Sequence, residues 1–243
     1  MSDIKLKDVK ILYRQKGTII TAVDGVSFNF HSRKNNVLIG YSGCGKTSLL
    51  NAIAGKILFN GDIYIGDKNI NDISVEDRKL AYVSQDFVLY PHMTIYDNIA
   101  FPLKLQKLSR EEMDIRIRKV AQRLDISFLL TRRPKYLSIG QQQRVAIARA
   151  LVKNPDILLM DEPLSNVDKE TVEEIKKLIK LIVKENRITL VYVSHDITSA
   201  LSIADFIFVM NEGKLIGEYT PEEFLKADNE IINSLKQELP HEK

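Results

Sequence analysis

The sequence contains one cysteine, no tryptophan and no long apolar run. A single cysteine, Cys44, cannot form an internal disulfide, so the chain suits a reducing compartment. The stretch from Phe206 to Met210 is among the longest apolar runs, whereas a membrane-spanning helix needs roughly 18 apolar residues. The first residues, Met-Ser-Asp-Ile-Lys, contain neither an apolar signal region nor a myristoylation motif. These absences predict a soluble, intracellular chain that reaches a membrane only through a partner.

A strong charge of one sign is also missing. The 35 lysines and arginines and the 32 aspartates and glutamates leave a net charge of +3. Nucleic-acid-binding chains normally concentrate far more positive charge, so we expect no nucleic-acid partner. Hydrophobic residues make up 44% of the 243 residues, which excludes disorder and is enough for one large domain or two modest ones.

Strand and helix patterns alternate along the chain. β-Branched and aromatic residues predict long strands over 4–13 and 18–30, with a turn at 15–17. A hairpin-like piece is expected over 60–67, and short strands over 37–39, 81–83, 157–160, 188–193, 206–210 and 214–219. Helices are predicted over 47–54, from a capping box at Ser109, over 172–182, from Thr220 with Pro221 at the first helical position, and around 229–236. The strand–helix–strand order between 157 and 193 favours parallel crossovers and hence an α/β sheet.

A glycine-rich loop follows the predicted strand at 37–39. Its sequence, Gly-Tyr-Ser-Gly-Cys-Gly-Lys-Thr, fits the pattern G-x-x-x-x-G-K-[ST] between a strand and a helix, the context that confirms it. Such a loop turns successive backbone amides inward around an anion, and the following helix adds its positive end. Lys46 adds charge at the outer phosphates, and the Thr47 hydroxyl is a hard oxygen for Mg²⁺. The predicted phosphate site comprises Gly40, Tyr41, Ser42, Gly43, Cys44, Gly45, Lys46, Thr47 and Ser48.

Two acids directly follow the predicted strand at 157–160. A nucleotide site needs a carboxylate at the end of a buried parallel strand next to the phosphate loop, and we expect Asp161 to hold Mg²⁺ there. Glu162 is one residue nearer the γ-phosphate, where a carboxylate orients or deprotonates a water molecule. Solvated acids at a strand end are the alternative, which the neighbouring phosphate loop disfavours. The pattern predicts a nucleotide hydrolase or a transferase.

The motifs predict an α/β fold with a P-loop NTPase core, an N-terminal antiparallel β subdomain and an inserted α-helical subdomain. We expect a single domain over 1–243. Its catalytic core with the β subdomain would occupy about 1–85 and 155–225, and the helical subdomain about 86–154. A C-terminal helix and tail would occupy about 226–243.

The segment Leu-Ser-Ile-Gly-Gln at 137–141 precedes a further helical pattern. Ser138 is a candidate N-cap, and a cap with Gly140 makes a second anion site, because free amides and the helix dipole point out of the same end. Here the sequence resembles the ATP-binding cassette (ABC) family, whose LSGGQ motif has this form. Ile139 replaces the first glycine of that motif, so its side chain is expected to point away from the nucleotide. Gln85 after a strand, Ser-Asn-Val-Asp at 165–168 and His195 at a strand end follow the family's order over nearly the whole chain.

The resemblance implies ATP and Mg²⁺ as ligands and a site shared by two cassettes that stack head to tail. The phosphate loop of one cassette would face Ser138, Gly140 and Gln141 of the other, and Asp168 would lie across the dimer seam. Hydrolysis would therefore need a dimer, of two identical or two different ABC ATPase subunits.

Individual roles are also implied by the resemblance. Gln85 would approach Mg²⁺, together with Thr47 and Asp161, and sense the coupled partner. His195 would hydrogen-bond the γ-phosphate and steady the attacking water, beside the general base Glu162. Tyr13 looks like the aromatic residue that stacks on adenine.

The segment over 82–104 resembles importer ATPases, most closely those of carbohydrate uptake. In such cassettes the region after Gln85 grips a coupling helix of the permease, and the apolar residues Phe87, Val88, Leu89, Tyr90 and Met93 could form that groove or part of the helical core. The implied partners are transmembrane permease subunits and an extracellular solute-binding protein, with the chain peripheral on the cytoplasmic face of the membrane. Sugar importers of this type usually carry a β-rich regulatory domain after the cassette, and we expect none here, so carbohydrate is favoured without being fixed.

Two other functions share these motifs: an ABC exporter ATPase and a soluble ABC ATPase without transport. No long coiled coil of the DNA-repair type lies between 46 and 138, and the chain has a single phosphate loop, unlike translation-associated cassettes. A nucleotide kinase would lack the 137–141 motif and His195. Import is therefore the leading prediction.

Overall fold

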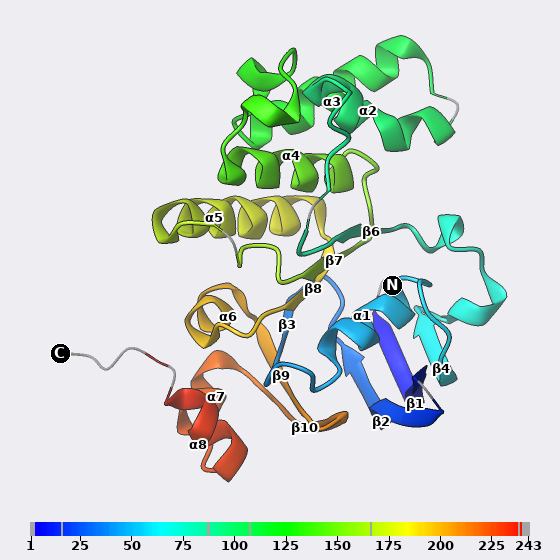
Figure 1. The fold of residues 1–243 in the computed structure, drawn as a ribbon, viewed down its shortest axis with the longest axis vertical. Coiled ribbons are helices and arrows are strands. Elements are labelled where there is room, and N and C mark those ends of the chain that lie inside the picture. The colour runs from blue at the N-terminus through cyan, green and yellow to red at the C-terminus, as the bar shows by residue number, and fades with distance from the viewer. Residues whose placement is uncertain are drawn as a thin grey trace.

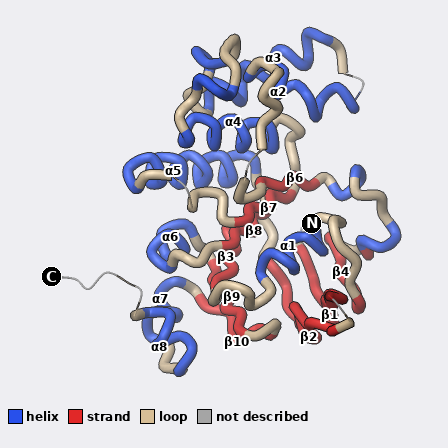
Figure 2. Tube along the Cα trace, viewed as in Figure 1, coloured by secondary structure: helices blue, strands red, loops and turns tan. Residues whose placement is uncertain are grey.

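The computed structural model of the chain describes residues 3–15, 17–86, 88–106, 108–165, 167–237 and 239. Figure 1 shows a group of helices at one end of the molecule, a central sheet, and a second, antiparallel sheet beside it. Figure 2 shows the same division by element type: the strands gather in two sheets, and the helical end contains almost none. Among the residues and ranges named above, Met1, Ser2, Lys16 of the predicted turn, Phe87, Lys107 of the helical subdomain, Asn166, and residues 238 and 240–243 of the tail lie outside the described part of the chain.

The antiparallel sheet opens the chain. β1 (Ile4–Gln15) lies between β2 (Thr18–Phe30) and β4 (Asn60–Ile65), and β4 pairs in turn with β5 (Lys68–Asn69). Gln15 at the end of β1 pairs with Thr18 at the start of β2, and Gly17 has a φ of 84°, which glycine adopts without strain. The buried side chains of this sheet pack on the helix that follows the phosphate loop and on one face of the central sheet.

The central sheet has the strand order β10-β9-β3-β8-β7-β6. Its strands are β3 (Asn35–Ile39), β6 (Leu80–Val83), β7 (Ile157–Asp161), β8 (Thr189–Val193), β9 (Phe206–Asn211) and β10 (Lys214–Tyr219). All neighbours run parallel except β9 and β10. Every residue of β3, β7 and β8 is buried, because the antiparallel sheet and α1 (Lys46–Ile53) cover one face and further helices cover the other.

Helices connect and cover these strands. α5 (Lys169–Asn186) joins β7 to β8, and α6 (Ile197–Ile203) joins β8 to β9. α2 (Ile95–Ala100), α3 (Arg110–Arg123) and α4 (Ile139–Leu151) lie between β6 and β7 in sequence and form the helical end of Figure 1. α7 (Pro221–Lys226) and α8 (Glu230–Lys236) follow β10. Within the described residues, no helix is long and apolar enough to cross a membrane.

Capping side chains fix several helix starts. Ser109 with Glu112, Ser138 with Gln141 and Thr220 with Glu223 form capping boxes at α3, α4 and α7. The predicted box at Ser109, the predicted N-cap Ser138 and the predicted first-turn proline are confirmed. The predicted α/β fold with its parallel sheet is confirmed as well. Two short helices, α2 and α6, were not predicted, although Thr94 and Asp196 cap them.

Candidate active site

Four neighbouring strands bring the expected site residues to one edge of the central sheet. Parallel strands end on the same side, and the register aligns Leu38 with Val193, Val193 with Asp161, and Met160 with Val83. The loops that leave this edge carry the phosphate loop after β3, His195 after β8, Glu162 after β7 and Gln85 after β6. The carboxyl edge of a parallel sheet is where ligands of α/β proteins bind.

The strand that carries the two acids is not adjacent to the strand before the phosphate loop. β8 lies between β3 and β7, so the acids reach the loop across the end of β8. They do reach it: the Thr47 hydroxyl donates a hydrogen bond to Oδ1 of Asp161 at 2.9 Å. Asp161 therefore reaches the phosphate loop as expected, although β8 separates its strand β7 from β3.

The backbone of the phosphate loop depends on glycine. Gly45 has a φ of 106°, and a Cβ added there would stand 2.2 Å from the carbonyl oxygen of Ala22. A side chain at this position would push the loop away from β2. Lys46 is buried, and its Nζ donates to the carbonyl oxygens of Gly40 at 2.7 Å and Tyr41 at 2.9 Å. The ammonium thus lies inside the curve of the loop, where phosphate oxygens would compete with these carbonyls for its protons.

Asp161 is held on both carboxylate oxygens. Oδ1 accepts from Thr47, and Oδ2 accepts from the Tyr82 hydroxyl at 3.0 Å. Burial, together with the Asp161 charge, raises the pKa of Tyr82 well above its usual range, so this phenol stays a donor. The Lys56 ammonium lies 3.3 Å from the centroid of the Tyr82 ring, and burial lowers the pKa of Lys56 while Asp161 partly offsets that effect.

This donor set fits Mg²⁺. Mg²⁺ prefers hard oxygen ligands and is commonly held by one or two protein oxygens together with substrate phosphates and water. Thr47 and Asp161 supply such a pair beside the phosphate loop. The described part of the chain contains no cluster of three or more histidine, cysteine or acidic side chains that would form an all-protein cage.

Glu162 and His195 face each other. Oε2 of Glu162 lies 2.9 Å from Nδ1 of His195, and the Glu162 side chain is 20% exposed while His195 is 58% exposed. Glu162 has a φ of 44°, a strained value for a residue with a side chain, and its amide donates to the carbonyl of Val193. The bend turns the carboxylate away from the line of β7 and toward the end of β8.

Tyr13 and Gln85 also reach the edge of the site. The Tyr13 hydroxyl donates to Oγ of Ser48 in α1 at 3.1 Å, and the tyrosine remains 38% exposed. This bond places the ring beside the helix that follows the phosphate loop. Gln85 is exposed two residues after the end of β6. The stacking of Tyr13 on adenine and the approach of Gln85 to Mg²⁺ stay predictions.

The second predicted anion site lies in the helical end of the molecule. Ser138 caps α4, its hydroxyl accepting from the Gln141 amide at 3.3 Å while the Gln141 side chain accepts from the Ser138 amide at 3.1 Å. Gly140 is tightly packed, since an added Cβ would stand 2.7 Å from Cγ2 of Thr171. Ile139 is half exposed and so does not fill the core. Figure 1 shows α4 at the helical end and α1 beside the antiparallel sheet, so the helices that carry the two predicted anion sites lie apart within this chain.

Asp168 is the N-cap of α5 and lies near Gly140 at the start of α4. Its carboxylate accepts from the Thr171 amide at 3.0 Å, and this backbone hydrogen bond lowers the pKa of Asp168. Gly140 and Asp168 thus both lie next to Thr171. The expected seam residues of α4 and α5 are therefore neighbours in the fold.

Two residues near Asp161, Tyr82 and Lys56, were not predicted from the sequence as site residues. Tyr82 lies on β6 opposite Leu159 of β7, two positions before Asp161. Both strands were predicted, but their pairing, which places Tyr82 near Asp161, is encoded by no local pattern. Lys56 follows the end of α1 and carries no pattern of its own.

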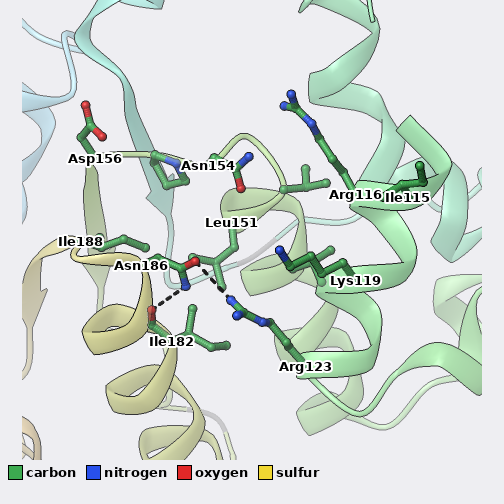
Figure 3. A pocket seen from close by; sticks show the side chains of 13 residues that line it. Ile115, Arg116, Lys119, Arg123, Leu151, Asn154, Asp156, Ile182, Asn186 and Ile188 are labelled. Carbon is green, nitrogen blue, oxygen red and sulfur yellow. Dashed lines mark hydrogen bonds between the residues drawn. The ribbon is translucent and has the colours of Figure 1, made fainter. Parts of the chain in front are cut away.

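A separate cavity of about 380 Å³ lies between α3 and the C-terminal ends of α4 and α5 (Figure 3). Arg123 donates to Oδ1 of Asn186 at 3.2 Å and pairs with Glu185 at 3.0 Å, so its charge is already matched. Asp156 and Ile188 line the cavity just before β7 and β8 begin, at the amino ends of these strands. It is therefore at the opposite end of the strands from the candidate active site.

A family model described as ABC transporter matches residues 23–165. The chain belongs to the ABC transporter family. It is 43% identical over 230 residues to the trehalose/maltose import ATP-binding protein MalK of Thermococcus litoralis, covering 92% of this chain and 61% of that protein. It is 40% identical to the oligosaccharides import ATP-binding protein MsmX of Bacillus subtilis, covering 96% of this chain and 63% of that one. The chain thus spans about three fifths of the length of these ABC relatives.

Solved ABC cassettes share its fold. The dimeric structure of MJ0796, a bacterial ABC transporter cassette, aligns with a TM-score of 0.82 and 33% identity, covering 90% of this chain and 98% of the cassette. A dimeric post-hydrolysis state of MJ0796 bound to ADP and Pi aligns with a TM-score of 0.80 and 32% identity. The predicted ABC family and fold class are confirmed.

Proposed function

We propose that this chain is the ATP-binding subunit of an importer and that it hydrolyses ATP at a site completed by a second cassette. The observation that carries the proposal is the convergence at one sheet edge of the phosphate loop, the Thr47–Asp161 pair and the Glu162–His195 pair. ATP hydrolysis needs a cradle for the phosphates, oxygens for Mg²⁺ and a base for water, and these are the groups that meet there.

The chain's own residues divide the chemistry. The amides of the phosphate loop and the Lys46 ammonium would bind the β- and γ-phosphates. Thr47 and Asp161, with Gln85, would hold Mg²⁺, which would neutralise charge on the transferred phosphoryl group. Glu162 takes a proton from a water molecule. The oxygen of that water attacks the γ-phosphorus, and the bond between the γ-phosphorus and the ADP oxygen breaks. Because Nδ1 of His195 faces Glu162, Nε2 is the ring nitrogen left to bond the γ-phosphate.

The second half of the site comes from another copy or a related subunit. Ser138, Gly140 and Gln141 form a capped helix start, where free amides and the positive end of the helix dipole favour an anion. This helix start and the phosphate loop do not meet within one chain, which supports their meeting across a head-to-tail dimer, with Asp168 at the seam. Dimeric cassettes of similar fold support the same arrangement.

Import of a carbohydrate is the favoured transport reaction. The named relatives are import ATP-binding proteins for trehalose and maltose and for oligosaccharides. A permease would dock on the region after Gln85, where Val88 is 67% exposed and Tyr90 is half-buried, whereas Leu89 is buried in the helical core. The chain would then lie on the cytoplasmic face of the membrane, and an extracellular solute-binding protein would deliver the cargo.

Transport by the assembled complex tests the proposal. The chain is purified with its permease subunits and reconstituted in vesicles, with ATP on one side of the membrane and the solute-binding protein on the other. Labelled maltose and trehalose are the test solutes, and a labelled amino acid is the non-carbohydrate control. ATP-dependent movement of a sugar from the binding-protein side supports carbohydrate import. Movement in the other direction, or ATP turnover with no permease that co-purifies, would support the exporter or the soluble ABC ATPase instead.

A further inference from the structure

Lys176 is a buried lysine of α5 that the proposed reaction does not use. It is only 3% exposed, and a buried ammonium is costly unless its protons are bonded. Its Nζ donates to the hydroxyl of Ser202 at 2.8 Å and to that of Ser199 at 3.4 Å, and it pairs with the Glu173 carboxylate. Three partners match its three protons. Since both serines belong to α6, the ammonium ties α5 to α6.

Ser199 extends this contact to the residue after His195. The Ser199 hydroxyl donates to Oδ2 of Asp196 at 2.5 Å, and Oδ1 of Asp196 accepts from the Thr198 amide at 2.9 Å as the N-cap of α6. The Asp196 carboxylate is thus held on both oxygens. Glu173 and Ser199 also line the same cavity of about 620 Å³ as Glu162 and His195.

The residue before His195 is fixed to the phosphate-loop strand. The Ser194 amide donates to the carbonyl of Leu38 at 3.2 Å, and the Ser194 hydroxyl bonds both the amide and the carbonyl of Asp196. His195 itself is largely exposed, and Glu162 is the partner that its ring bonds within the described residues. The position of the imidazole therefore depends on the backbone that Ser194 and Asp196 hold.

We propose that Lys176 is a positioning residue for His195, which acts through Ser199 and Asp196. The proposal rests on the ATPase function proposed above. Asp168 is the N-cap of α5, so the same contacts would transmit a displacement of α5 at the dimer seam to the imidazole beside the γ-phosphate. Neither the phosphate loop nor the Mg²⁺ ligands belong to this set of contacts, so nucleotide affinity should not depend on it.

Steady-state ATPase kinetics of the full chain test the role of Lys176. We expect Lys176→Met to lower kcat roughly 10- to 100-fold, because a small misplacement of a catalytic group has effects of this size, with KM for ATP within about twofold of wild type. Lys177→Met is the matched control, since Lys177 is exposed on the same helix, and it should keep wild-type kcat. Lys176→Arg, which keeps a cation with several donors, should retain more turnover than Lys176→Met.

A double-mutant cycle separates positioning of His195 from a general loss of stability. If Lys176 acts through His195, then adding Lys176→Met to His195→Ala should lower kcat no further, whereas independent effects would multiply. Multiplying losses, or a wild-type kcat in Lys176→Met, would overturn the proposal. Should Lys176→Met fail to fold, Ser199→Ala interrupts the same path and enters the same cycle. Full turnover in His195→Ala would overturn the role of His195 itself; a loss there with none in Lys176→Met and Ser199→Ala would overturn only this proposal.

Discussion

Oε2 of Glu162 lies 2.9 Å from Nδ1 of His195, at the ends of two neighbouring parallel strands. The contact orients the Glu162 carboxylate toward the imidazole. Asp161, one residue earlier, is instead bonded to Thr47. Adjacent acids on one strand end thus have different partners and different proposed roles.

Glu162→Gln should therefore bind ATP and fail to hydrolyse it. The amide keeps the shape of the side chain but cannot accept a proton, so we expect kcat to fall about a hundredfold or more, with ATP affinity preserved. Single-turnover hydrolysis and binding of a fluorescent ATP analogue measure the two separately. Glu222→Gln on α7 is the exposed control and should behave as wild type. Normal turnover in Glu162→Gln would remove the general-base role.

Tyr82→Phe should weaken the Mg²⁺ site without touching a proposed ligand. The change removes the donor to Oδ2 of Asp161, whose residue is only 6% exposed, so the carboxylate loses one of its two restraints. We expect the Mg²⁺ concentration for half-maximal ATPase to rise about tenfold, as when other outer partners of metal ligands are removed. Tyr64→Phe on β4 is the control. An unchanged Mg²⁺ dependence would contradict the role of Tyr82.

Gly140→Ala should strain the junction of α4 and α5. The new methyl group would stand 2.7 Å from Cγ2 of Thr171, and we expect the free energy of unfolding to drop by about 1–3 kcal/mol with a loss of ATPase activity. Thr171→Ser removes that methyl group, so the double variant should regain stability, helped by the higher helix propensity of alanine. Urea unfolding of the wild type, the two single variants and the double variant measures these free energies of unfolding. Equal destabilisation in the presence and absence of the Thr171 methyl group would refute the packing explanation.

Two capping carboxylates should make the fold sensitive to acid. Hydrogen bonds from the Ser109 amide and hydroxyl lower the pKa of Glu112, and those of Thr220 do the same for Glu223. A carboxylate whose pKa is lowered by folding stabilises the fold above its ordinary pKa of 4.5, and this contribution is lost as the pH falls through the lowered value. The free energy of unfolding should therefore decrease below about pH 4.5.

Glu112→Gln isolates that effect for α3. Glutamine can still form the capping box but carries no charge, so stability at pH 7 should fall slightly, while the slope of unfolding free energy against pH below 4.5 should become shallower. Urea unfolding between pH 3 and pH 7 measures the slope. Glu111→Gln, an exposed neighbour in the same helical turn, is the control. An unchanged slope in Glu112→Gln would show that the cap does not titrate as described.

The parts of the site that the sequence predicted are those fixed by local spacing. Glycine positions and the strand-to-helix context determine the phosphate loop, and the acids at 161 and 162 follow a buried strand directly, so both were readable along the chain. Ser138 was readable for the same reason, because an N-cap and its box partner are three residues apart.

The parts that it did not predict depend on packing between distant segments. Tyr82 reaches Asp161 across a strand pair, and Lys176 of α5 reaches Ser199 of α6. The insertion of β8 between β3 and β7 is a matter of strand order, which no local pattern encodes. α6 has only seven residues, too few for its helical period to stand out.

The structure of Glu162→Gln trapped with ATP and Mg²⁺ tests the shared site most directly. We predict two cassettes with two ATP molecules between them, and the Ser138 hydroxyl of each copy within about 3 Å of the γ-phosphate held by the other copy's phosphate loop. ATP bound by a single cassette, with Ser138 facing solvent or a different surface of its neighbour, would contradict it.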